Sequence, residues 1–125
     1  MHLLTLLEKQ KTVRLETRKR DGSWVATPVS VAVSDGHVYF RTWNVSGKAK
    51  RLRNFPGEVR LTPCTTRGKP AGETVTGSAR LLDDGEAAKA RASLAAKYPV
   101  LQGWFVPAYH RLRGWKTLHY EWEPH

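Results

Sequence analysis

The sequence predicts a mainly β protein, in which about six strands form a small closed or nearly closed barrel with one medial helix and short flanking helices. Three observations lead to this prediction. Most of the chain consists of short segments in which apolar and polar residues alternate, the period of a half-buried strand, and turn residues separate these segments. A single long segment has the composition of a helix. With 125 residues and no internal repeat or low-complexity linker, the chain fits one domain over residues 1–125.

The N-terminal part of the chain predicts a short helix followed by a strand. Leucines recur at helical spacing over residues 2–10, which predicts an amphipathic helix. From Thr12 the pattern changes to alternation, with apolar residues and Thr17 at the odd positions and charged residues at the even positions. This alternation predicts a half-buried strand over residues 12–18.

Two Asp-Gly turns predict that the chain continues as an antiparallel meander. One pair lies at residues 21–22 and the other at residues 35–36. The run between them, residues 24–34, is rich in valine and predicts one strand, and residues 37–43 predict the next. Three consecutive antiparallel strands are therefore predicted before residue 44.

The second half of the chain predicts a further hairpin, the long helix and a last strand. Residues 58–66 and 73–82 predict the hairpin, with Gly77 as a bulge or a site of close backbone approach. Residues 83–98 are rich in alanine, start with acidic residues that suit an N-cap and carry a lysine near their end, as a stable helix does. An irregular segment containing proline and glycine then leads to a predicted last strand over residues 116–123.

The charge of the chain indicates an anionic partner. Lysine and arginine outnumber aspartate and glutamate by 21 to 11, which gives a formal net charge of +10. Nucleic acid, an anionic membrane surface, and a phosphorylated or carboxylated small molecule would all match this charge. Apolar residues are interleaved throughout, so the sequence predicts a folded domain and not a disordered basic tail.

The compartment indicated by the sequence is the cytoplasm. Cys64 is the single cysteine, which excludes an internal disulfide and a cysteine-rich zinc site. The first ten residues are too short for the apolar core of a signal peptide and lack a cleavage pattern. No segment approaches the ~20 apolar residues of a membrane span. We expect a soluble cytoplasmic protein without a membrane span.

The sequence offers no set of catalytic or metal-binding side chains. It contains no Gly-x-Ser-x-Gly or His-Glu-x-x-His motif, and its five histidines are scattered. The adjacent carboxylates Asp83 and Asp84 lie where a helix cap is expected. We therefore expect no catalytic side chain and no metal.

The most informative segment is the basic run at residues 46–53. Ser46 suits an N-cap, and the following residues predict a short helix that ends before Pro56. Lys48 and Arg51 would lie on one face of its first turns, where free backbone N–H groups and the helix dipole attract anions. A solvated basic face is the alternative reading of such a run. Its position after a strand and at the start of a helix favours a phosphate-binding site.

The motifs of this chain together resemble those of a known family. A T-P-V strand, a strand ending in Y-F-R-T, the segment S-G-K-A-K-R-L-R and the strand V-R-L-T-P-C follow one another in the family's order and spacing. They resemble the pyridoxamine 5′-phosphate oxidase-like split β-barrel proteins, also described as FMN-binding split barrels. Within this family they are most similar to the branch of small oxidoreductases that uses coenzyme F420, a deazaflavin. The resemblance extends over nearly the whole chain.

The resemblance implies a homodimer that binds one cofactor in each of two grooves at the subunit interface. It assigns nine residues to the cofactor: Thr27, Pro28, Val29, Arg41, Thr42, Ser46, Lys48, Lys50 and Arg51. The first three would line the ring system, largely through strand backbone, and the next two would lie beside the ribityl chain or the phosphate. The last four would hold the phosphate and the start of an acidic tail.

The function implied by the resemblance is hydride transfer from reduced coenzyme F420 to a small-molecule substrate. Such an enzyme needs no catalytic side chain, because the cofactor ring itself donates the hydride. An FMN-dependent oxidase or reductase of the same fold is the first alternative. A β-barrel that binds nucleic acid through exposed aromatic residues is the second. It is disfavoured because Tyr39 and Phe40 are adjacent and must point to opposite faces of a strand.

Overall fold

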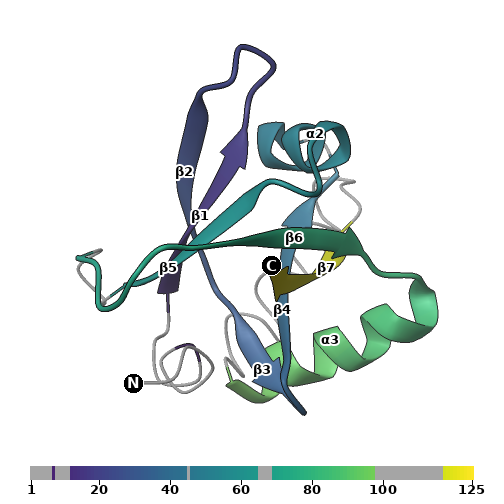
Figure 1. Ribbon diagram of the computed structural model, residues 1–125. Coiled ribbons are helices and arrows are strands. Elements are labelled where there is room, and N and C mark those ends of the chain that lie inside the picture. The colour runs from purple at the N-terminus through teal and green to yellow at the C-terminus, as the bar shows by residue number, and fades with distance from the viewer. Residues whose placement is uncertain (1–6, 8–11, 45, 65–68, 98–116) are drawn as a thin grey trace.

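The computed structural model describes Leu7 and residues 12–44, 46–64, 69–97 and 117–125. The helices and strands of these residues are β1 (Thr12–Arg18), β2 (Trp24–Val29), β3 (Ala32–Ser34), β4 (His37–Trp43), α2 (Gly47–Asn54), β5 (Val59–Cys64), β6 (Val75–Leu81), α3 (Asp84–Lys97) and β7 (Thr117–Pro124). The strands form one seven-stranded sheet in the order β2-β1-β5-β6-β7-β4-β3. Helices α2 and α3 lie at different sides of this sheet (Figure 1).

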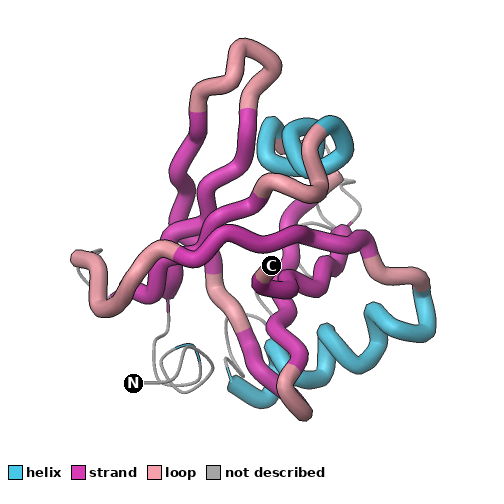
Figure 2. The backbone as a smooth tube through the Cα atoms, in the orientation of Figure 1, coloured by secondary structure: helices cyan, strands magenta, loops and turns pink. Residues whose placement is uncertain are grey.

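The fold class predicted from the sequence is confirmed. The described strands pair in antiparallel fashion, and the sheet curls into a half-barrel, the architecture of a split β-barrel (Figure 2). Its two edge strands, β2 and β3, are joined by only two residues, Ser30 and Val31. The chain itself therefore connects the two ends of the curled sheet.

The predicted meander is wrong, because the run over residues 24–34 forms two strands. β2 pairs with β1 and β3 pairs with β4, so that the two halves of the run lie at opposite ends of the sheet order. Pro28 gives a physical reason. Proline has no N–H group to donate to a ladder and is therefore found on edge strands, whereas a meander would place this run in the centre.

The other predicted strands and helices that lie within the described residues are confirmed, with small shifts at their ends. The hairpin of β5 and β6, the long helix α3 and the last strand β7 all lie where the sequence predicts them. At the start of α3, the Asp83 carboxylate accepts a hydrogen bond from the Glu86 N–H at 2.8 Å, and the Glu86 carboxylate accepts one from the Asp83 N–H at 3.4 Å. This reciprocal pair is a capping box, which fixes the first turn of α3.

The core lies inside the curl of the sheet. Val13 and Leu15 of β1 are fully buried there, as their alternation predicts. The rings of Phe40 and Tyr120 stack with centroids 5.2 Å apart. Trp122 is 1% exposed, and its indole N–H donates to the Val59 carbonyl at 3.0 Å, so this large ring has both apolar contacts and a hydrogen-bond acceptor.

Two sequence predictions concern residues outside the described part of the chain. The helix predicted over residues 2–10 is represented only by Leu7, which is helical and fully buried in the core. The segment between α3 and β7, predicted to be irregular, is not described. Within the described residues, no helix is long and apolar enough to span a membrane.

Candidate functional site

The candidate site is formed by α2 and by two strand edges that have no partner strand in the described part of the chain. β2 pairs only with β1, and β3 covers β4 only from His37 to Tyr39. Helix α2 follows β4 directly and contacts both β4 and β1. Since unpaired strand edges present backbone N–H and C=O groups, this region offers a ligand both backbone and side-chain partners.

The start of α2 has the geometry predicted from the sequence. Ser46 is the N-cap, with extended backbone angles, and its hydroxyl accepts a hydrogen bond from the Ala49 N–H at 3.0 Å. The Thr42 hydroxyl lies 3.0 Å from the same Ser46 oxygen. Ala49 and Leu52 are buried, which orients the helix so that its cationic side chains point away from the core.

Lys48 and Arg51 form the cationic centre of the site. Burial lowers the pKa of Lys48 to about 8, and the charge of Arg51 adds to this effect. Burial also lowers the pKa of Arg51, whose Nε donates to the Thr17 hydroxyl of β1 at 2.7 Å. Within the described residues, neither side chain lies within ion-pair distance of a carboxylate. The protein therefore holds two partly desolvated cations side by side without a negative charge of its own.

The space beside Gly47 is filled by Arg51. A Cβ atom added at Gly47 would lie 2.9 Å from Nη1 of Arg51. The missing side chain at this position therefore lets the Arg51 guanidinium reach the first turn of α2.

A basic pocket lies next to this centre. It has a volume of about 290 Å³ and lies between α2 and the β1–β2 turn. Its lining residues, which include five cations and no carboxylate, are Arg18, Lys19, Arg20, Gly47, Lys50, Arg51 and Asn54. The sequence prediction included Lys50 and Arg51 but missed the three cations at residues 18–20. Three adjacent cations in the sequence could have drawn attention to residues 18–20. Only the packing of α2 on β1, however, shows that these cations line the same pocket as Lys50 and Arg51.

A second pocket lies along β2, the strand predicted to line a ring system. Its volume is about 240 Å³, and Thr27 and Pro28 line it together with residues of β1 and Cys64. The Thr27 hydroxyl is buried without a hydrogen-bond partner in the described part of the chain. The Val29 side chain belongs instead to the hydrophobic core, so only its backbone could contact a ligand here.

Arg41 does not join the other predicted residues. It precedes Thr42 on β4, so the two side chains point to opposite faces of the sheet. Thr42 contacts the cap of α2, whereas Arg41 lies on the same face as Tyr39, which packs against α3. The described structure thus brings Thr42, Ser46 and Arg51 together at one end of α2 and places Arg41 elsewhere.

The donors of this site fit an anionic ligand that also carries a flat apolar part. Lys48 and Arg51, which have no ion-pair partner among the described residues, and the N-terminus of α2 match a phosphate group. The β2 pocket supplies apolar walls next to the Thr27 hydroxyl, which has no hydrogen-bond partner in the described part of the chain. No group of three potential metal-ligating side chains occurs among the described residues. Fold and site together define a split β-barrel protein with a basic candidate site.

Comparisons with known proteins support this fold assignment. No protein-family model matches the sequence, and no curated protein matches it. Solved structures do match: a protein of unknown function from Agrobacterium tumefaciens has 20% identity and a TM-score of 0.76, with 95% of this chain and 50% of that chain covered. This chain thus spans half the length of that protein.

Two further structures show what kinds of protein share the fold. The heme storage protein HutZ from Vibrio cholerae has 13% identity and a TM-score of 0.74, with 97% of this chain and 86% of that chain covered. A putative pyridoxamine 5′-phosphate oxidase from Listeria innocua has 17% identity and a TM-score of 0.66, with 98% and 90% covered. These neighbours are split β-barrel proteins of the pyridoxamine 5′-phosphate oxidase type, and this chain has their fold.

Proposed function

We propose that the chain is an oxidoreductase that binds coenzyme F420 and transfers a hydride from its reduced form to a small-molecule acceptor. The observation that carries the proposal is the pair Lys48 and Arg51, partly desolvated and without a described carboxylate partner at the N-terminus of α2. Such a pair is stabilised by a bound phosphate. The resemblance of the sequence to the F420-dependent branch of the family indicates that this phosphate would belong to coenzyme F420.

In this proposal Thr42, Ser46, Lys48 and Arg51 hold the phosphate. Lys50 and the cations of the β1–β2 turn, which line the same pocket, face the acidic glutamyl tail. Thr27 and Pro28 contact the ring through the 240 Å³ pocket, with Val29 contributing backbone only. The cofactor supplies the hydride chemistry, and the residues of this chain bind it, orient its ring and exclude water. No catalytic side chain is required.

FMN is the alternative cofactor for the same site. Its single phosphate needs only the residues at the start of α2, and it would leave Lys19 and Arg20 of the basic pocket without a ligand, whereas Arg18 already pairs with Glu58 at 3.1 Å. The basic pocket of about 290 Å³ therefore favours a cofactor with an acidic tail. Heme is a third ligand to test, because HutZ is a heme storage protein.

A calorimetric titration of the purified chain with coenzyme F420, FMN and heme tests the proposal. We expect coenzyme F420 to bind more than tenfold more tightly than FMN, since each added charge-assisted contact is worth ~1.5–3 kcal/mol. The double variant Lys19→Ser/Arg20→Ser should bind coenzyme F420 less tightly and FMN as tightly as the parent, so that the difference in affinity between the two cofactors becomes smaller. Tighter binding of FMN would favour the alternative, and binding of heme alone would overturn the assignment as a hydride-transfer enzyme.

The proposal includes a homodimer with the cofactor at the subunit interface. Light scattering should give twice the 14.1 kDa mass of one chain. The pockets along β2 and α2 are both partly open to solvent in a single chain, and a second subunit would close them. A monomeric mass at micromolar concentration would contradict the dimer and the interface location of the cofactor.

A further inference from the structure

A largely buried arginine, Arg41, lies between the sheet and α3, and none of the ion pairs among the described residues includes it. Arg41 is only 8% exposed, and its Nε and Nη2 atoms are buried without hydrogen-bond partners in the described part of the chain. Its cross-strand neighbour on β7 is His119, which is also buried. An imidazole supplies no negative charge, so this neighbour does not neutralise the guanidinium.

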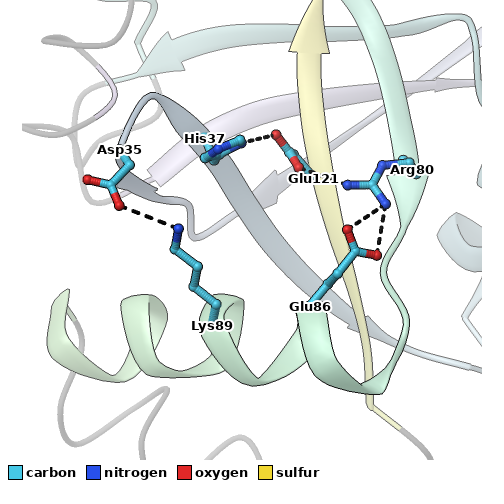
Figure 3. A network of polar contacts seen from close by, with 6 residues as sticks. All are labelled: Asp35, His37, Arg80, Glu86, Lys89 and Glu121. Atoms are coloured by element: carbon cyan, nitrogen blue, oxygen red, sulfur yellow. Dashed lines mark hydrogen bonds and ion pairs between the residues drawn. The ribbon is translucent and has the colours of Figure 1, made fainter.

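Two carboxylates on this side of the sheet, Glu121 and Glu86, already have cationic partners. Figure 3 shows Glu121 of β7 between His37 and Arg80: it accepts from His37 Nδ1 at 2.5 Å and from Arg80 Nη2 at 3.1 Å. Arg80 also pairs with Glu86 at the start of α3. Both oxygens of Glu121 thus have partners, and none of the described ion pairs includes Arg41.

The helix above Arg41 adds a second positive charge. Ala90 and Leu94 of α3 are buried against the sheet, and Arg91 lies next to Ala90 on the helix. Burial lowers the pKa of Arg41 to about 10, and the charge of Arg91 contributes to this shift. Two arginines from different elements therefore face the same region, where each raises the energy of the other.

A buried guanidinium without a counter-ion is strongly unfavourable in a folded protein. We propose that Arg41 and Arg91 form an oxyanion-binding site between β4 and α3, whose ligand is a carboxylate or phosphate group. The site has two guanidinium groups, the side chain that best matches such planar oxyanions. A bound oxyanion would supply the negative charge that the described residues do not.

This site is separate from the proposed cofactor phosphate. Arg41 and Thr42 point to opposite faces of β4, and the phosphate site at α2 lies on the Thr42 side. The inference therefore does not depend on coenzyme F420, and each site can fail without the other.

Site-resolved phosphate titration tests the inference. Inorganic phosphate is added at constant ionic strength, and backbone amide resonances are followed by NMR in two regions. The first region consists of Arg41 and residues 90–92, and the second consists of residues 47–49 at the start of α2. We expect saturable shifts in the first region of the parent. Arg41→Met should weaken this binding by about tenfold or more and leave residues 47–49 unaffected. Lys48→Ala should do the reverse. A parallel titration with γ-glutamylglutamate distinguishes a carboxylate ligand from a phosphate ligand.

Thermal melts provide an independent readout. In chloride buffer, Arg41→Met should melt no lower than the parent, because it removes an uncompensated buried charge. Phosphate should raise the melting temperature of the parent more than that of the variant. Arg91→Met, at an exposed position, provides the same comparison if Arg41→Met does not fold. If neither oxyanion shifts residues 90–92, or if both variants respond to phosphate like the parent, the site does not exist.

Discussion

Replacing Gly77 by alanine is expected to destabilise the protein by about 3 kcal/mol or more, at the top of the range for overpacking. An added Cβ would lie 2.7 Å from Cε2 of the Trp122 ring and would clash with the Glu123 carbonyl. Neither neighbour can move freely. Trp122 is buried and hydrogen-bonded to Val59, and Glu123 belongs to the ladder between β6 and β7.

The measurement is urea unfolding followed by circular dichroism, with Gly57→Ala as the matched control. Nothing lies within 4 Å of a Cβ added at Gly57, so this variant should change the free energy of unfolding by less than ~0.5 kcal/mol. If Gly77→Ala is as stable as Gly57→Ala, then β6 does not pass as closely over Trp122 as the structure indicates.

Close approach at Gly77 is one of several features that follow from the sequence. Ser46 before a basic helix and acidic residues before α3 are local signals, because each is set by neighbours within a few residues. A glycine within a strand pattern is also a sequence signal, although the residues that approach Gly77, Trp122 and Glu123, are distant in the chain. The structure confirms all three. Strand alternation was equally informative for β1, where three consecutive odd positions are buried.

Features that depend on distant pairing could not be predicted in the same way. Valines recur at odd positions both before and after Ser30, so the sequence pattern does not show that the chain leaves β2 there and that β2 and β3 lie at opposite ends of the sheet. The cations at residues 18–20 join the site only because α2 packs on β1. The family motif places Arg41 next to Thr42 in sequence, but strand alternation separates their side chains in space.

Affinity for the cofactor is expected to depend most strongly on Lys48. Lys48→Ala removes a charge-assisted contact to the phosphate worth ~1.5–3 kcal/mol, so affinity should fall by roughly ten- to a hundredfold. The stability of the fold should hardly change, because the apolar contacts of α2 come from Ala49 and Leu52. Calorimetric titration at neutral pH, with melts followed by circular dichroism as the control, measures both quantities.

The pH dependence of cofactor binding tests the contact between Lys48 and the phosphate more specifically than the loss of affinity in Lys48→Ala does. In the free protein its pKa is about 8, lowered by burial and then by Arg51, and a bound phosphate would raise it again by favouring the charged form. Binding above that pKa therefore takes up a proton, and affinity should fall by about tenfold for each further pH unit until the pKa of the complex is reached. Below about pH 8, the pKa of Lys48 in the free protein, Lys48 is charged in both states, so its protonation should not make the affinity depend on pH. Lys48→Arg keeps the charge over this range and should remove the decline. If the parent and Lys48→Arg lose affinity equally as the pH rises, Lys48 does not hold the phosphate.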